Sequence, residues 1–279
     1  MKDRKGFTLI ELLVVIAIIA LLMSIVVPSL KTAREVAQAT ISRSNLRQWG
    51  LVWKLYTDNY DGRFPYWKVV GSGTYHRGSW IQAIRAYLPE DREKMLLCPT
   101  ASLENPEFIQ VDGRYDPEAH GGVRYAYSMG LPSAAEQAVG ITEPELCSYG
   151  MNSWCANSGN ESGNVQQRPA SELWQTITAV RSTSEVPMML DSMWRGGGPW
   201  DDRGIRISAP TQEGEWRGME AEISHFCIPR HRGRVNSVFV DLHVEDVPLK
   251  DLWGQKWHKS YNTGTLPPNA WPEWMGRYR

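Results

Sequence analysis

The chain has 279 residues, 30 of them basic and 31 acidic, and its formal net charge is −1. This balance leaves no overall basic field, so the sequence does not indicate a nucleic-acid-binding protein. The length suffices for one sizeable domain with an appendage, or for two small domains. Hydrophobic residues make up 42% of the chain, and many of them lie in one N-terminal block.

The first six residues are cationic, and an almost unbroken apolar run from Phe7 to Val27 follows them. About 20 apolar residues in a helix span the roughly 30 Å hydrocarbon core of a bilayer. We therefore expect one transmembrane helix over residues 7–27. Because the basic residues precede this run, the N-terminus is expected in the cytoplasm and the rest of the chain outside.

Two other interpretations of this segment fit less well. A cleaved secretory signal has an apolar core of about 7–15 residues that ends at a small-residue cleavage site. The run here is longer and contains no such site. A simple membrane anchor would not carry Glu11, because a charged carboxylate within a membrane helix costs about 2.5–3.5 kcal/mol.

The segment GFTLIE at residues 6–11, with the apolar run after it, resembles the N-terminal signal of type IV prepilins and type II secretion pseudopilins. The resemblance implies that a prepilin peptidase cuts between Gly6 and Phe7 and, as a methyltransferase, methylates the new Phe7 amine. It also implies that Glu11 of an incoming subunit neutralises the Phe7 amine of its neighbour. The implied partners are other pilin or pseudopilin subunits and an inner-membrane assembly platform.

The resemblance divides the chain into a leader (1–6), a transmembrane helix (7–27), an amphipathic extension of that helix (28–59) and an exported globular domain (60–279). Pro28 predicts a kink at the start of the extension. Turn residues at 59–62 predict its end. Between them, apolar residues recur at steps of three or four and predict one face that packs on a folded domain. They are Leu30, Ala33, Ala37, Ile41, Trp49, Val52 and Tyr56.

The elements predicted after Arg63 are short. We expect a helix over 79–88 that ends at Pro89, and extended pieces at 96–99 and 148–152. A strand is predicted over 186–193, followed by a hairpin of 235–240 and 244–247 and a short helix at 250–253. The expected fold class is α+β: a long N-terminal helix packed on a small antiparallel β-sheet with long loops.

Residues 229–244 resemble the C-terminal signature of large pseudopilin-like proteins, in which a His precedes an Asp-Gly pair by about nine residues. His231 and Asp241 match this pattern. Leu242 stands where the glycine would be, and the tight turn that a glycine permits is therefore in question.

The four cysteines lie downstream of the apolar run and form no CxxC pair, so the sequence does not indicate a zinc ribbon. In an exported domain an even number of cysteines predicts two disulfides. We expect Cys147 to pair with Cys155 across a short loop, and Cys98 to pair with Cys227. Four reduced, buried thiols are the alternative.

Late acidic and histidine residues suggest a calcium site. Asp241, His243 and Glu245 share one side of the predicted hairpin. The alternative is that His231, Asn236 and Asp241 tie the hairpin together through hydrogen bonds, with no metal.

Thirteen tryptophans give two further alternatives. Exposed indole rings would bind glycans or surfaces, whereas buried ones would fill a loop-rich core. The tryptophans considered for glycan binding are Trp194, Trp200, Trp216, Trp253, Trp257, Trp271 and Trp274.

The expected function is structural, and no catalytic arrangement is recognised in the sequence. We expect a minor or pseudopilin-type subunit of a type IV pilus-like filament or type II secretion pseudopilus. It would be anchored once in the inner (cytoplasmic) membrane with its domain periplasmic or extracellular. Two alternatives are a displayed carbohydrate- or surface-binding protein and a membrane-tethered hydrolase that uses the late His/Asp cluster.

Overall fold

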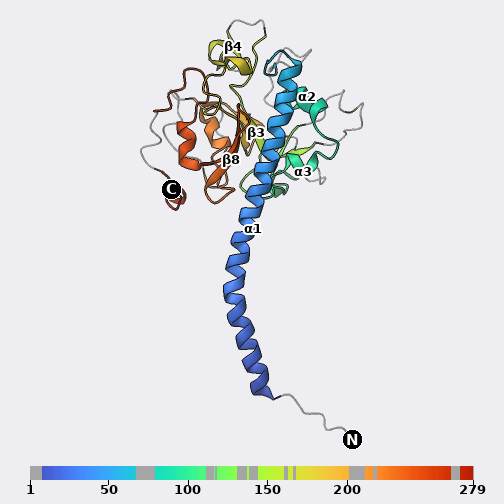
Figure 1. Ribbon diagram of the computed structural model, residues 1–279, viewed down its shortest axis with the longest axis vertical. Helices are drawn as coiled ribbons and strands as arrows, with labels where there is room; N and C mark the ends of the chain where they lie inside the picture. Colours follow the sequence, from blue (N-terminus) through green and yellow to red (C-terminus); the bar gives the residue numbers. More distant parts are fainter. Residues whose placement is uncertain are drawn as a thin grey trace.

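The computed structural model describes residues 8–66, 79–110, 116, 118–130, 137, 144–159, 163–165, 168–200, 211–215, 219–264 and 271–278. A long helix forms a stem, and its far end is embedded in a globular head (Figure 1). Together the stem and head give an α+β fold, as expected.

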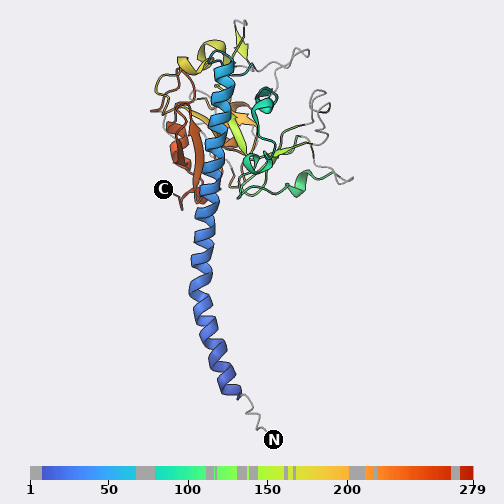
Figure 2. The same cartoon turned by 45° about the vertical axis from the view of Figure 1, so that its right-hand side comes forward.

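The stem is α1, which spans Leu9–Asn59 and is therefore about 75 Å long. It ends where Asp61 and Gly62 take left-handed backbone conformations, with φ of 52° and 78°. The helix passes through Pro28 without interruption, and Figure 2 shows it gently curved below the head. The kink at Pro28 stays a prediction.

A five-stranded sheet forms the centre of the head, in the order β7-β3-β6-β8-β9. Its neighbours pair antiparallel, except that β3 and β7 are parallel at one edge. α1 crosses β8 and also contacts β6 and β9 (Figure 2). The strands are β3 (Tyr149–Asn152), β6 (Pro187–Asp191), β7 (Gly196–Gly197), β8 (Arg234–Phe239) and β9 (Val244–Pro248).

Short elements surround this sheet. Two small antiparallel pairs are β1 (Tyr127–Ser128) with β2 (Leu146–Cys147), and β4 (Asn164–Val165) with β5 (Arg168–Pro169). The short helices are α2 (Ser79–Ile84), η1 (Arg85–Tyr87), α3 (Glu93–Leu96), η2 (Pro106–Phe108), η3 (Ala170–Glu172), η4 (Ile177–Ala179), η5 (Met219–His225), η6 (Leu249–Gly254) and η7 (Glu273–Met275).

Most of the predicted elements of the head are confirmed. The helix over 79–88 is present as α2 and η1, and the strand over 186–193 as β6. The hairpin is β8 and β9, and the short helix at 250–253 is η6. The extended piece at 96–99 is wrong at its start, because Leu96 still belongs to α3 and only Cys98 forms an isolated bridge, with Ala101.

Tryptophan side chains fill the core where α1 meets the head. The rings of Trp49 and Trp53 on α1 both contact Trp80, with centroids 5.8 and 5.9 Å apart. Of the tryptophans considered for glycan binding, four are buried and two are half-buried against the core, while Trp216 lies outside the described residues. Core packing is therefore confirmed for the six that the structure describes.

The turn between β8 and β9 forms without the expected glycine. Leu242 takes a left-handed conformation, with φ of 71°, which costs a non-glycine residue about 1–2 kcal/mol. Its half-buried side chain packs beside Gly50 of α1, where a Cβ would stand 3.5 Å from Leu242 Cδ2. The backbone strain at this turn is thus accompanied by an apolar contact with the stem.

Candidate assembly site

Glu11 is the acidic residue in the first turn of α1, and hydrogen bonds hold its side chain in a defined position. Thr8 is the N-cap, and its hydroxyl accepts a hydrogen bond from the Glu11 backbone N–H at 3.3 Å. Glu11 Oε2 in turn accepts hydrogen bonds from the Thr8 backbone N–H at 2.8 Å and from the Thr8 hydroxyl at 2.7 Å. This capping box turns the carboxylate back toward the beginning of the helix, where the helix dipole favours negative charge.

Thr8 is absent from the site residues expected above. Its spacing from Glu11, Thr-x-x-Glu before an apolar run, is the sequence pattern of a capping box, so the signal is present in the sequence. Gly6 and Phe7, the expected cleavage and methylation residues, lie outside the described residues. Their roles stay predictions.

The apolar half of α1 makes no contact with the described residues of the head. Every side chain from Leu9 to Val27 is exposed. Within the described part of the chain, α1 is the one helix that is long and apolar enough to cross a membrane. Exposed apolar side chains on all sides of a helix are stable in lipid or against other apolar helices, but not in water.

The second half of α1 carries two apolar stripes rather than one. Successive residues are rotated by about 100°, so the exposed and the buried apolar residues fall on faces roughly 140° apart. The buried face, which packs on the head, includes Leu46, Trp49, Val52, Trp53 and Tyr56. The outward stripe consists of Leu30, Ala33, Ala37, Ile41, Leu51 and Leu55, all exposed.

The predicted single stripe is therefore wrong in its first half. Leu30 and Ile41 are 66% and 50% exposed and do not contact the head. The sequence pattern does not separate them from Trp49, because steps of three and four residues connect the two faces of the helix over several turns. The outward stripe leaves an apolar surface along the stem that the head does not cover.

A buried polar network fixes the head on the stem, and its centre is Asp191 at the end of β6. Oδ2 of this carboxylate lies 3.0 Å from His231 Nε2 and accepts a hydrogen bond from the Asn236 backbone N–H at 2.9 Å. Oδ1 accepts a hydrogen bond from the Ser42 hydroxyl of α1 at 3.3 Å, and the Arg230 guanidinium lies 4.0 Å away. These contacts join β6, β8 and α1 in one arrangement.

The network continues along α1. The Tyr149 hydroxyl of β3 donates to Ser42 Oγ at 3.2 Å and accepts from Asn45 Nδ2 at 3.3 Å. Asn45 Nδ2 also donates to the backbone carbonyls of Lys94 and Leu97, at 2.8 and 3.0 Å. Since buried polar groups are costly when unpaired, these bonds specify the register of the stem against the head.

Burial and charge act in opposite directions on the two ionisable partners at this centre. Burial alone would lower the pKa of His231, but the Asp191 carboxylate raises it to about 10. Burial alone would raise the pKa of Asp191, but His231 and Arg230 together with the Asn236 N–H hold it below its ordinary value of 3.8. The pair is therefore ionised at neutral pH.

The expected hydrogen bonds that join His231, Asn236 and Asp241 across the hairpin are wrong. His231 and Asn236 both bond to Asp191, whereas Asp241 lies in the β8–β9 turn and pairs with His243. The sequence does not indicate Asp191, because its contact with them depends on β6 lying beside β8, about 40 residues further along the chain.

The expected calcium ligands do not converge on one point. Asp241 Oδ1 lies 2.5 Å from His243 Nδ1, while Glu245 Oε2 lies 3.9 Å from the opposite ring nitrogen, Nε2. Calcium requires six to eight oxygen ligands around a single centre, and this arrangement does not supply them.

Among the described residues, the side chains of Cys98, Asp191 and His231 do bring their ligand atoms within 4.8 Å of one another. However, the Asp191 carboxylate is already paired with His231 and accepts two further hydrogen bonds, and Arg230 adds a positive charge beside it. The three side chains therefore lie at the centre of the buried polar network, and their proximity needs no metal ion to explain it.

The expected disulfides are absent, because all four cysteines are buried, free thiols. Cys98 Sγ instead lies 3.5 Å from His231 Nε2. Burial raises the pKa of Cys147 to about 11, and it also raises the pKa values of Cys155 and Cys227, which keeps these thiols protonated.

Comparison with known proteins finds similarity in the N-terminal segment. Residues 1–27 match the family described as the prokaryotic N-terminal methylation motif. Over 41 residues the chain is 56% identical to the type IV wide pilus major component PilA4 of Thermus thermophilus. These residues are 15% of this chain and 31% of that protein, so the chain spans about a third of the length of the curated relative that it matches. No solved structure matches the chain.

The matched motif coincides with the structural features of the stem. It covers the capping box at Glu11 and the fully exposed apolar half of α1. The fold of the remaining chain, a long helix packed on a small sheet, agrees with the same class of protein. The chain therefore carries a prepilin-type motif at its N-terminus and is similar there to a type IV pilin, and its fold is consistent with a pilin-like protein.

Proposed function

We propose that the chain is a non-catalytic, minor or pseudopilin-type subunit of a type IV pilus-like filament or of a type II secretion pseudopilus. The observation that carries this proposal is the Glu11 carboxylate, held at the start of an exposed apolar helix within the matched motif. Such a carboxylate is costly in a membrane unless it is paired. Its cost becomes useful when pairing occurs between subunits.

In the single chain, the side chain that binds the Glu11 carboxylate is that of Thr8. Thr8 supplies neutral donors, so no cation among the described residues pairs with this negative charge. After cleavage behind Gly6, the methylated amine of Phe7 would carry a positive charge beside it. We infer that Glu11 of each entering subunit pairs with the Phe7 amine of a neighbour, which sets the axial position of the new subunit.

The outward stripe of α1 supports the same function. Its apolar residues follow the exposed membrane segment up to Ile41 and recur at Leu51 and Leu55 near the end of the helix, with the exposed polar residues Ser44 and Gln48 between them on the same face. In a filament this stripe would pack against the stems of neighbouring subunits, and burial of its side chains would contribute about 25 cal/mol for each Å² removed from water.

The size of the head supports a minor or pseudopilin-type role. The matched segment is 15% of this chain but 31% of the Thermus major component, which is therefore about half as long. A subunit with the larger head is suited to the tip or to a low-copy position. Before assembly it would reside in the cytoplasmic membrane with the head outside, where prepilin peptidase and the assembly platform act on it.

The proposal is tested by comparing Glu11→Gln with wild type in cells that process and assemble the full chain. Gln retains the size and the hydrogen-bond acceptor of Glu but removes the charge. We expect mass spectrometry to find methyl-Phe7 at the N-terminus of both proteins. We expect Glu11→Gln to be depleted from sheared filaments by at least about tenfold, because the neighbour's amine would be left unpaired.

Thr8→Val is the matched control, because it removes the capping box and keeps the charge. We expect this variant to be processed and to enter filaments at close to the wild-type level. An unprocessed Met1 terminus in the wild type would contradict the proposal. Filament incorporation of Glu11→Gln at the wild-type level would contradict it as well.

A further inference from the structure

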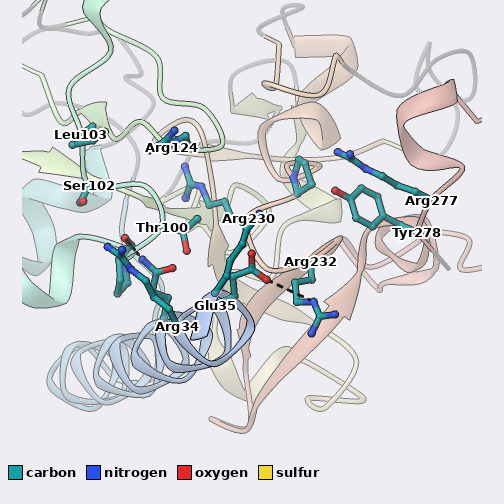
Figure 3. Close-up of a pocket in the computed structure, with 14 residues that line it drawn as sticks. Arg34, Glu35, Thr100, Ser102, Leu103, Arg124, Arg230, Arg232, Arg277 and Tyr278 are labelled. Carbon is teal, nitrogen blue, oxygen red and sulfur yellow. Dashed lines mark hydrogen bonds and ion pairs between the residues drawn. The ribbon is translucent and has the colours of Figure 1, made fainter. Parts of the chain in front are cut away.

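A pocket of about 850 Å³ opens at the base of the head, where α1 leaves it. Six basic side chains line it, and among its lining residues Glu35 is the one acidic side chain. Figure 3 shows that they come from separate parts of the chain: the stem, the loop before β1, the segment before β8 and the C-terminal end. The basic residues are Lys31, Arg34, Arg124, Arg230, Arg232 and Arg277.

Two of these cations are committed to contacts within the protein. The Arg230 guanidinium donates to the backbone carbonyls of Gly122, Ser148 and Ser192 and lies 4.0 Å from Asp191. Arg232 forms an ion pair with Glu35 at 3.9 Å (Figure 3).

The other four cations have no acidic partner in the part of the chain that the structure describes. Lys31 and Arg34 come from the stem, Arg124 from the loop before β1, and Arg277 from the C-terminal end. The pocket therefore has a surplus of positive charge, which favours an anionic ligand.

The position of the pocket along the stem indicates where that anion comes from. The apolar run ends at Val27, and Lys31 follows four residues later, which is about 6 Å along a helix. The headgroup layer on each side of a bilayer is roughly 5–8 Å thick. With the apolar run in the membrane, Lys31 lies at the level of the lipid phosphates, and Arg34, about 10 Å beyond Val27, lies just outside this layer with its long side chain able to reach it.

The rim of the pocket also suits a membrane surface. Leu103 borders it and is 52% exposed. The Arg277 guanidinium lies 4.9 Å from the centre of the Tyr278 ring, and both residues line the pocket. Tyrosine is enriched at membrane interfaces because its ring is apolar and its hydroxyl is polar. A free inorganic anion would use the cations alone, whereas a lipid would also use these apolar groups.

We propose that this pocket binds the phosphate group of an anionic phospholipid on the membrane face from which the head projects. The inference rests on the proposed membrane anchoring of the stem, but not on filament assembly. A bound headgroup would hold the head against the bilayer before assembly. Withdrawal of the subunit from the membrane into a filament would break this contact. The lipid bound in the pocket would therefore add to the free energy needed to extract the subunit from the bilayer.

Native mass spectrometry of the full chain in a neutral detergent tests the proposal. The protein is titrated separately with phosphatidylglycerol, with phosphatidylcholine of the same acyl chains, and with inorganic phosphate. The variant carries Arg34→Gln and Arg124→Gln. Its matched control carries Arg47→Gln and Arg181→Gln, which remove one exposed arginine from α1 and one from a loop, both outside the pocket.

We expect wild type and control to retain phosphatidylglycerol in preference to phosphatidylcholine. Each removed pocket charge should weaken phosphatidylglycerol binding about fivefold, and both together about 25-fold. Equal weakening in the control would overturn the pocket as the site, since it would show general attraction to positive charge. Phosphate binding as tight as that of phosphatidylglycerol would overturn the lipid assignment in favour of a soluble anion.

Wild-type and variant chains are also reconstituted into nanodiscs, which separates this inference from the proposed function. A chain that enters the discs but shows no preference for phosphatidylglycerol refutes the pocket alone. A chain that does not enter them refutes both the membrane anchor and the lipid site. If the wild type never enters filaments but the lipid preference holds, the filament proposal fails and the pocket stands. If the pocket binds an acidic segment of a neighbouring subunit in place of lipid, the lipid assignment is likewise refuted.

Discussion

At the residue scale, the junction of stem and head depends on Asp191. This carboxylate is fully buried, lies 3.0 Å from His231 Nε2, and reaches α1 through the Ser42 hydroxyl. A buried charge is tolerated only while it is paired. Loss of the negative charge would leave two cations, Arg230 and His231, without their counter-ion in the same enclosed space.

We predict that Asp191→Asn destabilises the head by about 3–5 kcal/mol, the range observed when one partner of a buried pair is removed. Urea denaturation of the full chain in detergent, followed by tryptophan fluorescence, measures the change. Asp241→Asn is the control, because it breaks the half-exposed pair with His243 and should cost less than about 1 kcal/mol. Equal costs for the two variants would refute the central role of Asp191.

The same pair predicts how stability changes with pH. The raised pKa of His231 contributes stability that is complete below its unfolded value of 6.5 and is lost as the pH rises toward 10. The lowered pKa of Asp191 contributes stability that is complete above 3.8 and is lost below it. We therefore expect a plateau between about pH 4 and 6.5, with a decline on both sides.

Thermal denaturation across this pH range, in wild type and in His231→Gln, checks the prediction. The variant cannot lose a proton at position 231, so the decline between pH 6.5 and 10 should disappear from its curve. An unchanged alkaline decline in the variant would assign the pH dependence to other groups.

At the element scale, α1 serves two neighbours at once. Its buried stripe packs on the head through Trp49, Trp53 and Tyr56, while the side chains of its outward stripe are exposed. A helix that had only to carry the head would have polar residues on the outward face. The apolar residues that predominate on the outward face instead support the contacts between subunits that we propose.

We predict that Ile41→Glu together with Leu55→Glu prevents filament incorporation and changes head stability by less than about 0.5 kcal/mol for each site, as is usual for exposed positions. Trp53→Ala, on the buried stripe, should instead cost about 3–5 kcal/mol. Arg47→Glu is the control for added charge on an exposed, off-stripe position. Sheared-filament yield and urea midpoints distinguish the two faces, and normal incorporation of the double variant would contradict this prediction.

The elements of the fold could be predicted wherever a local pattern determines them. The apolar run and the turn residues at 59–62 indicate α1 and its end, and alternation indicates β8. The outward stripe could not be separated from the buried one, because both share steps of three and four residues. Asp191 and the unpaired state of the cysteines depend on which distant segments meet, and a single sequence does not report this.

At the scale of the whole molecule, the stem and the head are joined only along the upper part of α1. Side chains from Pro28 to Arg34 are exposed, and the first described contacts of the helix with head loops are the ion pair of Glu35 with Arg232 at 3.9 Å and the hydrogen bond of Gln38 Nε2 to the Pro99 carbonyl at 3.1 Å. A short exposed segment of α1, residues 28–34, therefore lies between the apolar segment and the head, and the basic pocket opens beside it.

We predict that the stability of the head is independent of reductant. Two disulfides would contribute about 2–4 kcal/mol each, so their reduction would lower the melting temperature by many degrees. With free thiols, the melting curves of the full chain with and without reductant should coincide. Thiol titration in denaturant should count all four cysteines. A fall in melting temperature on reduction would show that disulfides form.

The enclosed thiols also have a consequence for the export of the head that we propose. A head that completes its fold before meeting an oxidant hides all four sulfur atoms, whereas a head that lingers unfolded offers them to every disulfide-forming enzyme outside the membrane. Incorrect pairs would then trap the slow molecules. The yield of correctly folded subunits thus depends on the rate of folding relative to the rate of thiol oxidation. Cells that lack their thiol oxidase should therefore yield more of this subunit, not less.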